Sequence, residues 1–167
     1  LTNFRSFKDT QSIDFAKLTL LFGPNSVGKS TILLALFYLQ HILKNGQCDP
    51  QRIDALGGKY VGGFKNLVHC RALDKSITIK LEYDKEGAIG TTYGRTLTML
   101  NDMENLDGSL LLLEDQASQT ETVALEWVIS WSESRQTAYV EKYSVWLNGE
   151  HLATTHSDAG LNNPLLE

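Results

Sequence analysis

The strongest constraint on the fold is the segment Gly23-Pro24-Asn25-Ser26-Val27-Gly28-Lys29-Ser30, which satisfies the pattern G-x-x-x-x-G-K-[ST]. An apolar run of strand length, Leu18 to Phe22, precedes it, and a helical pattern from Ser30 to about Lys44 follows. A glycine-rich turn between a strand and a helix points backbone N–H groups at phosphates, and the helix N-terminus favours the same anion. The segment therefore predicts a nucleoside triphosphate-binding loop.

The side chains of this loop have separate expected roles. Lys29, the predicted catalytic residue, would neutralise β- and γ-phosphate oxygens, and the Ser30 hydroxyl would be a Mg²⁺ ligand. The expected cofactors are ATP and Mg²⁺. The predicted nucleotide-binding residues are Gly23, Pro24, Asn25, Ser26, Val27, Gly28, Lys29, Ser30 and Thr31.

Around the loop, the patterns predict a P-loop core over residues 1–46. Residues 1–7 are expected to form a first strand, Ile13 and Phe15 a second, and Leu18 to Phe22 a strand buried on both faces of a parallel or mixed sheet. Apolar residues occupy most of the circumference of the following helix, which predicts a central helix. They are Ile32, Leu33, Leu36, Leu39, Ile42 and Leu43.

The later part of the chain reads as a mainly antiparallel β subdomain over residues 77–156, so the fold class is α/β. Alternating apolar residues predict strands over 77–83, 123–131 and 139–147. Asn148-Gly149 predicts a two-residue hairpin turn into a strand over 151–155. Further strands are expected at about 91–99 and 109–113, whereas the glycine-rich residues 47–70 predict no clear element.

Composition indicates one domain with a real core, since 42% of the 167 residues are hydrophobic. The two cysteines, Cys48 and Cys70, are too far apart for a metal-binding pair, which favours a reducing compartment without disulfides or zinc. No apolar run has membrane-spanning length, and no signal pattern opens the chain. The expectation is a cytoplasmic protein with no membrane partner.

Charge divides the chain into two parts. Residues 1–90 contain 12 Lys or Arg and 8 Asp or Glu, whereas residues 91–167 contain 3 and 12. An acidic surface grips a nucleic-acid backbone poorly, because phosphate contacts need cations. Any nucleic-acid contact is therefore expected through the basic N-terminal half or through a partner.

The string Leu-Thr-Asn-Phe-Arg-Ser-Phe-Lys-Asp at residues 1–9, followed by the loop, resembles the N-terminus of ABC-type ATPases of the SMC/RecF kind. In that group an N-F-[RK]-S-[FY] strand precedes a G-P-N-x-x-G-K-S-T loop. The resemblance is specific over residues 1–45. Residues 62–83 more weakly resemble prokaryotic SMC-like ATPases of phage-defence operons, including Septu-type and retron-associated ATPases. Many relatives carry glycine where Ser26 stands, so a positive φ there would strain this chain mildly.

The resemblance implies an ABC/SMC-type head lobe, with a mixed sheet around the P-loop helix and an Arg5 side chain that approaches the nucleotide. A solvated edge arginine is the alternative for Arg5. The resemblance also places the signature loop, Walker B carboxylates and switch histidine in a C-terminal lobe. None is recognisable here, because the acidic residues after Ser109–Leu113 stand in the order Glu-Asp, the reverse of a Walker B strand. The chain begins without Met, so residues 1–167 are expected to be the N-terminal part of a larger ATPase.

Other residues carry weaker signals. The loop from Gly57 to Gly63 could flank the nucleotide base or a partner, or be a plain surface loop. The histidines have no metal-binding spacing, and the tryptophans fit packing on a sheet face better than base stacking. These residues are His41, His69, His151, His156, Trp127, Trp131 and Trp146.

Three functions fit these patterns to different degrees. The first is an ATPase head that dimerises, or forms a higher oligomer, around nucleotide and regulates a nuclease or another DNA-acting effector in antiviral defence; a DNA-repair role is its rival. This chain alone is expected to be inactive in hydrolysis. The second is a scaffold that binds ATP without turnover and organises a nuclease or reverse-transcriptase complex. The third, a P-loop GTPase or kinase, is disfavoured because the chain has no N-K-x-D string.

Overall fold

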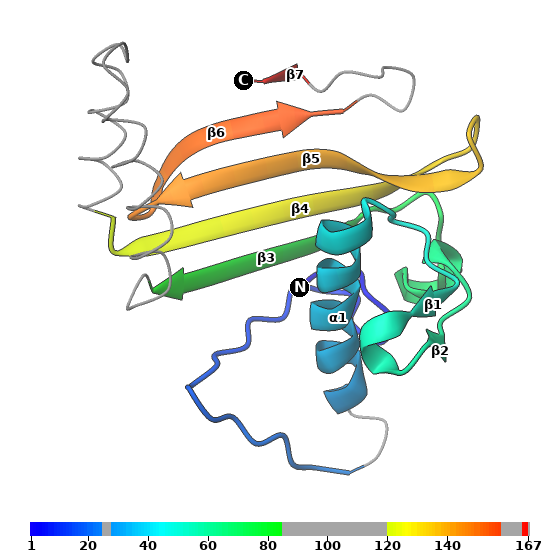
Figure 1. The fold of residues 1–167 in the computed structure, drawn as a ribbon, viewed down its shortest axis with the longest axis horizontal. Coiled ribbons are helices and arrows are strands. Elements are labelled where there is room, and N and C mark those ends of the chain that lie inside the picture. Colours follow the sequence, from blue (N-terminus) through cyan, green and yellow to red (C-terminus); the bar gives the residue numbers. More distant parts are fainter. Residues whose placement is uncertain (25–27, 85–119, 158–164, 167) are drawn as a thin grey trace, which may run out of the picture. The chain divides into compact units, whose positions relative to one another are not determined.

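The computed structural model describes residues 1–24, 28–84, 120–157 and 165–166 (Figure 1). Strands β3 to β7 form a five-stranded sheet in the order β3-β4-β5-β6-β7, and β1 and β2 form a separate two-stranded antiparallel sheet. Figure 1 shows β3, β4, β5 and β6 running in alternating directions. The elements are α1 (Lys29–Asn45), β1 (Arg52–Ile53), η1 (Asp54–Leu56), β2 (Lys59–Tyr60), η2 (Phe64–Asn66), η3 (His69–Arg71), β3 (Ile77–Asp84), β4 (Thr122–Ser132), β5 (Thr137–Leu147), β6 (Glu150–His156) and β7 (Leu165–Leu166).

Two compact units divide the chain. The first comprises Leu1–Lys80, Glu126–Ser144 and Thr154–Glu167, and the second comprises Leu81–Leu125 and Val145–Ala153. The predicted phosphate loop, α1 and the opening segment all belong to the first unit. No helix in the described ranges has the length and apolarity needed to cross a bilayer.

The core of the first unit collects side chains from distant parts of the sequence. The Phe4 ring stacks on Tyr38 of α1 with centroids 6.0 Å apart, and Phe64 stacks on Trp131 of β4 at 6.3 Å. Such ring pairs stabilise a core beyond the area they bury. The fully buried residues include Phe4, Tyr38, Ile53, Phe64, Leu67, Ile77 and Ile129.

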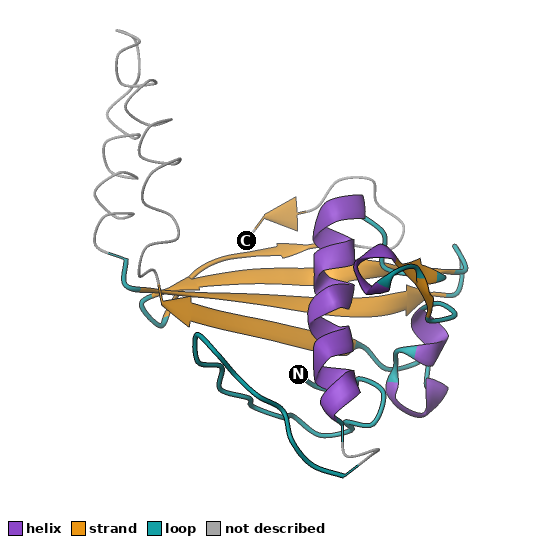
Figure 2. Cartoon of the chain, turned by 60° about the horizontal axis from the view of Figure 1, so that its bottom comes forward, coloured by secondary structure: helices purple, strands orange, loops and turns teal. Residues whose placement is uncertain are grey.

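Helix α1 begins and ends where its sequence predicts. Gly46 ends it in the left-handed conformation (φ 66°), and its N–H donates to the Ile42 carbonyl. Near this end, α1 lies against β5 and β6, because Ile42, Val140 and Thr155 line one pocket of about 390 Å³ (Figure 2). The prediction that apolar contacts surround the helix is wrong, since Leu33 is 47% and Leu43 65% exposed. Only one side of α1 packs within the described chain.

The opening residues form a tight turn, so the prediction of a strand over residues 1–7 is wrong. Only isolated bridges occur, from Thr2 to Thr78 of β3 and from Phe4 to both Phe7 and Val68. Asn3 and Arg5 have positive φ angles of 54° and 48°, which a regular strand does not accommodate. The prediction of a second strand at Ile13 and Phe15 is also wrong, because these residues pair with no strand.

The segment Leu18–Phe22 differs most from its sequence pattern. It is an extended loop, and the large apolar side chains of Leu18, Leu20 and Phe22 are 80%, 67% and 84% exposed. The prediction of a buried strand in a parallel or mixed sheet is therefore wrong for the structure described. A strand is buried only when neighbouring strands pair with it and another layer covers it. Among the described residues, no strand pairs with Leu18–Phe22.

The antiparallel strands of the second half are largely confirmed. The predicted strands at 77–83, 123–131 and 139–147 correspond to β3, β4 and β5, and the strand at 151–155 to β6. Asn148 and Gly149 turn from β5 into β6 with positive φ angles of 50° and 80°, as an Asn-Gly hairpin requires. Asn148 Oδ1 also accepts hydrogen bonds from the N–H groups of Glu121 (2.7 Å) and Thr122 (3.1 Å). The predicted strands at 91–99 and 109–113, and the acidic residues after them, lie outside the described residues.

Candidate phosphate-binding site

The candidate site is the junction between the phosphate loop and α1. Gly28 stands immediately before the helix in the left-handed conformation (φ 99°, ψ −2°), which glycine adopts without strain. Its carbonyl accepts hydrogen bonds from the N–H groups of Thr31 (2.9 Å) and Ile32 (3.0 Å), which closes the first helical turn. Of the predicted loop residues, Asn25, Ser26 and Val27 lie outside the described part of the chain.

The N-terminus of α1 has the electrostatic character that an anion needs. The helix has 17 residues, no side-chain cap and no acidic residue in its first turn. The first N–H groups of a helix have no intrahelical acceptor, and the helix dipole adds partial positive charge there. A phosphate group therefore fits this end as both acceptor and counter-charge.

Lys29 and Ser30 bring the predicted side-chain chemistry to the same turn. Lys29 Nζ donates to the carbonyl oxygens of Gly23, at 2.6 Å, and of Pro24. The ammonium group therefore lies against the first two residues of the loop. Ser30 is exposed, so its hydroxyl is accessible to a metal ion, whereas Thr31 is buried and its Oγ1 lies 3.1 Å from Ser6 Oγ.

Arg5 lies at the tip of the opening turn. Its backbone N–H donates to the Leu67 carbonyl at 2.7 Å, and its side-chain Nε donates to the Asn66 carbonyl at 3.3 Å. His69 Nδ1 donates to the Arg5 carbonyl at 2.7 Å, because a carbonyl only accepts. The guanidinium is thus directed at η2, and its predicted contact with a nucleotide stays a prediction.

Two contacts to the phosphate loop were missed from the sequence. A Cβ atom built on Gly28 would lie 2.6 Å from Phe7 Cζ, so the Phe7 ring fills the space beside this glycine. Ser6 contacts Thr31 through the hydroxyl pair described above. Both residues belong to the N-F-[RK]-S-[FY] string, but the strand assignment concealed that a turn carries them to the loop.

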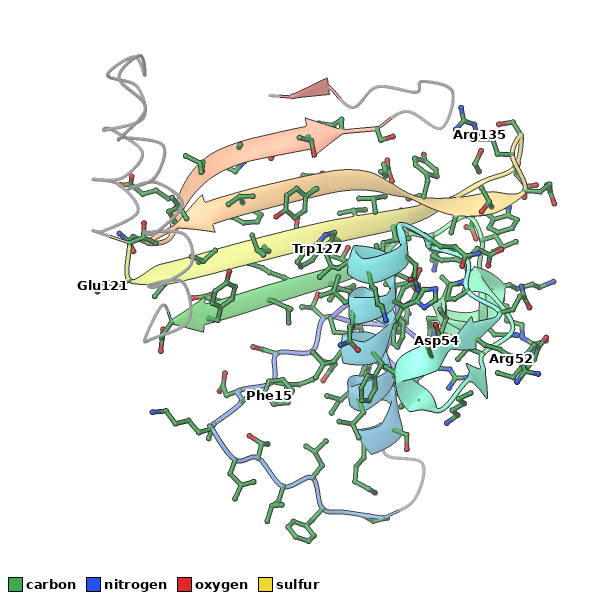
Figure 3. All side chains as sticks on the ribbon, in the orientation of Figure 1. Phe15, Arg52, Asp54, Glu121, Trp127 and Arg135 are labelled. Atoms are coloured by element: carbon green, nitrogen blue, oxygen red, sulfur yellow. The ribbon has the colours of Figure 1, made fainter. Side chains whose placement is uncertain are left out.

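The weaker candidates have structural partners. Arg52, labelled in Figure 3, contacts the loop from Gly57 to Gly63. Its guanidinium lies 5.9 Å from the ring centroid of Tyr60 and donates to the Gly58 carbonyl at 3.1 Å. Trp127 packs on Tyr143 with ring centroids 5.3 Å apart, which confirms its predicted role in sheet packing. Across the described ranges, no group of three or more His, Cys, Asp or Glu side chains is arranged to hold a metal ion.

Burial perturbs two groups behind the site. Tyr38 is fully buried, and its hydroxyl donates to the Cys48 carbonyl at 2.6 Å. Burial, and then the negative charges of Cys48 and Asp49, raise the Tyr38 pKa well above 10.0. Burial also raises the Cys48 pKa from 9.0 to about 11, with a smaller contribution from Asp49. Cys48 is therefore a neutral packing residue at physiological pH.

Comparison with known proteins agrees with this geometry. Residues 1–137 match the AAA ATPase domain family. The chain is 39% identical over 77 residues to the putative cfxQ-like protein R730 of Acanthamoeba polyphaga mimivirus, covering 44% of this chain and 19% of that protein. It is 46% identical over 39 residues to an ATP/GTP phosphatase of Helicobacter pylori, covering 23% of this chain and 10% of that protein. The chain thus spans less than a fifth of either relative.

No solved structure matches the chain. The family match covers most of its length, including the phosphate loop, α1 and β4. A P-loop NTPase domain implies nucleotide binding, with Mg²⁺ as the usual metal. The chain belongs to the AAA ATPase domain family.

Proposed function

We propose that this chain binds Mg²⁺–ATP at the junction of residues 23–31 and supplies the phosphate-binding half of an ATPase head. The observation that carries the proposal is the uncapped N-terminus of α1, with Lys29 and Ser30 on its first turn and left-handed Gly28 before it. Backbone N–H groups, an ammonium and a hydroxyl converge there. These are the groups that phosphoryl-transfer sites use to position phosphates and neutralise their charge.

Within this proposal each residue has one task. Lys29 moves from the loop carbonyls to the β- and γ-phosphate oxygens, and Ser30 donates its oxygen to Mg²⁺. Asn25, Ser26 and Val27 contribute backbone N–H groups, and Thr31 contributes the start of the helix. Arg5 is a candidate for a further phosphate contact. Mg²⁺, held by Ser30, would supply positive charge that helps to neutralise the phosphates.

The exposed apolar residues support a larger head than this chain alone. Leu18, Leu20 and Phe22 precede the loop, and Leu33 and Leu43 stand on the outer side of α1, all of them at least 47% exposed. Three large exposed apolar side chains at alternate positions of one segment, Leu18–Phe22, mark a surface that another layer covers. We propose that the C-terminal lobe of an SMC/RecF-like head covers them and carries the Walker B and signature residues.

The proposed role of the complete protein rests on the resemblance of residues 1–45 and 62–83. It is a cytoplasmic ATPase whose heads dimerise on nucleotide and regulate a nuclease or DNA-acting effector in antiviral defence. DNA repair is the rival, and a non-hydrolysing scaffold is the second candidate. Phosphate release by the complete protein separates ATPase from scaffold: activity abolished by Lys29→Ala supports the ATPase, whereas absent turnover with an ATP-dependent assembly supports the scaffold.

The binding proposal is tested by titrating the chain with a fluorescent ATP analogue, with and without Mg²⁺. Lys29→Ala is expected to weaken binding about tenfold or more, because a charged hydrogen bond to phosphate contributes roughly 1.5–3 kcal/mol. Lys44→Ala is the matched control, since this exposed lysine stands at the other end of the same helix. Equal affinities of the two variants, or no binding by the wild type, would contradict the proposal.

A second variant separates two roles of Lys29. Lys29→Gln keeps a hydrogen-bond donor for the Gly23 carbonyl but removes the charge. If charge neutralisation of phosphate is the main role, Lys29→Gln binds as weakly as Lys29→Ala. If it binds like the wild type, Lys29 acts by closing the loop and the proposed phosphate contact is wrong.

A further inference from the structure

The turn Phe4–Phe7 has an unusually complete set of backbone contacts. The N–H of each end residue donates to the carbonyl of the other at 2.9 Å, which leaves Arg5 and Ser6 as the two residues of the tip. Arg5 has a φ of 48°, a conformation that non-glycine residues adopt only when their surroundings hold it. The turn is therefore held in place by tertiary contacts.

Those contacts come from the core of the first unit. Phe4 is fully buried and stacks on Tyr38, and the tip is held by Leu67 and His69 through the backbone of Arg5. The three partners come from different places: Tyr38 from α1, Leu67 from just after η2, and His69 from η3. A turn fixed at three places provides a rigid base for the side chains of Ser6 and Phe7.

The free side of the turn meets the phosphate loop at two points. The Phe7 ring occupies the space beside Gly28, with Cζ and Cε1 at 2.6 and 2.7 Å from the position of a Cβ on that glycine. Ser6 Oγ lies 3.1 Å from Thr31 Oγ1 on the first turn of α1. One contact therefore precedes Lys29 and Ser30 in the sequence, and the other follows them.

We infer that Phe7 is a positioning residue for nucleotide binding, with Ser6 as its partner, and this inference rests on the function proposed above. The Phe7 ring supports Gly28 in its left-handed conformation, and Ser6 fixes the adjoining helical turn. The backbone N–H groups at the start of α1, that of Lys29 among them, are thereby held in place before ATP arrives. Preorganisation of this kind raises affinity because less ordering remains to be done on binding.

The test compares Phe7→Ala with Phe15→Ala, which removes the same side chain from an exposed position of the same unit. Phe7→Ala is expected to weaken Mg²⁺–ATP binding roughly three- to tenfold, and Phe15→Ala to leave it unchanged. Phe7→Leu fills part of the space beside Gly28 and is expected to restore most of the affinity. Ser6→Ala should give a smaller loss than Phe7→Ala. Equal affinity of Phe7→Ala and Phe15→Ala would overturn the inference.

Hydrogen exchange without nucleotide provides the readout that a merely structural role would not change. In Phe7→Ala, amide exchange is expected to accelerate in residues 23–31, while the C-terminal half of α1 keeps its wild-type rates. Acceleration throughout the unit in both Phe7→Ala and Phe7→Leu would make Phe7 an ordinary core residue and overturn the inference. If the wild type binds no ATP, the proposed function fails, but local acceleration in residues 23–31 still supports the coupling of Phe7 to the loop.

Discussion

The turn Phe4–Phe7 contacts the phosphate loop at Gly28, and the segment Leu18–Phe22 directly precedes the loop in sequence. Both contain phenylalanine, yet Phe4 is fully buried and Phe22 is 84% exposed. Both belong to the first compact unit. The turn has its backbone groups paired with Leu67, with His69 and within itself. In residues 12–22, all of them described, the hydrogen bonds join only Ala16 to Thr19.

In this contrast, the apolar residue that enters the core is the one whose backbone groups are paired. Backbone N–H and C=O groups lose water when a segment is buried, and burial is costly unless protein groups replace it. The opening turn has such partners on η2 and η3, so its phenylalanine can stack on α1. The backbone of Leu18–Phe22 has no hydrogen-bond partner within the described residues, and the side chains of Leu18, Leu20 and Phe22 are exposed there.

The largest expected change in stability tests this comparison directly. Phe4→Ala should lower the free energy of unfolding by about 3–5 kcal/mol, because it empties a fully buried site. Phe22→Ala should change it by less than about 0.5 kcal/mol, since the ring contacts mainly water. Urea denaturation of the two variants measures both values. A similar loss in Phe22→Ala would show that Leu18–Phe22 is packed in solution.

A titration to alkaline pH should lower stability through the buried thiol of Cys48. The folded chain keeps the Cys48 proton to a pKa of about 11, whereas an unperturbed thiol loses it near 9.0. The unfolded state therefore binds fewer protons between these values, and stability falls as pH rises from about 9 to 11. The loss should reach about 2–3 kcal/mol, and is measured by urea denaturation across this range.

Cys48→Ala provides the control for this titration. It should remove the thiol contribution and leave the part due to Tyr38, whose raised pKa acts in the same direction. An unchanged pH dependence in Cys48→Ala would show that the thiol is accessible to water. Cys48 would then not be a buried residue.

The next effect concerns one hydrogen bond on the same buried side. Tyr38→Phe leaves the Cys48 carbonyl without the 2.6 Å bond from the Tyr38 hydroxyl and should cost about 1–2 kcal/mol. Tyr60→Phe is the matched control, because Tyr60 is 64% exposed and should change stability by less than about 0.5 kcal/mol. Thermal denaturation of both variants tests the difference, and equal shifts would contradict the assigned burial of Tyr38.

The smallest change in stability is expected on the exposed side. Leu20→Asn with Phe22→Asn should leave the unfolding free energy within about 0.5 kcal/mol of wild type. The same double variant should reduce the fluorescence of a hydrophobic dye bound to the native chain, because it removes the most exposed part of the apolar surface. Leu152→Asn, at an exposed residue of the second unit, should reduce the fluorescence less. A stronger effect of Leu152→Asn would place the dye-binding surface elsewhere.

Local patterns predicted the elements whose structure depends on neighbours in sequence. The helix after Lys29, the alternation in β3 and β4, and the turn at Asn148-Gly149 all follow from short-range geometry. The loop pattern likewise identified the helix N-terminus and the two side chains on its first turn. Hydrophobicity alone, however, placed Leu18–Phe22 and the outer side of α1 in a core that the described chain does not form around them.

The amino-acid sequence by itself predicted the phosphate-binding loop and determined the helix after it and the antiparallel strands, because glycine conformation, helical period and strand alternation are properties of adjacent residues. Only the tertiary structure decided that residues 4–7 turn instead of extending, that Phe7 supports Gly28, and that Phe22 faces water. Those outcomes depend on contacts between residues far apart in the chain. No local pattern specifies which backbone groups find a partner.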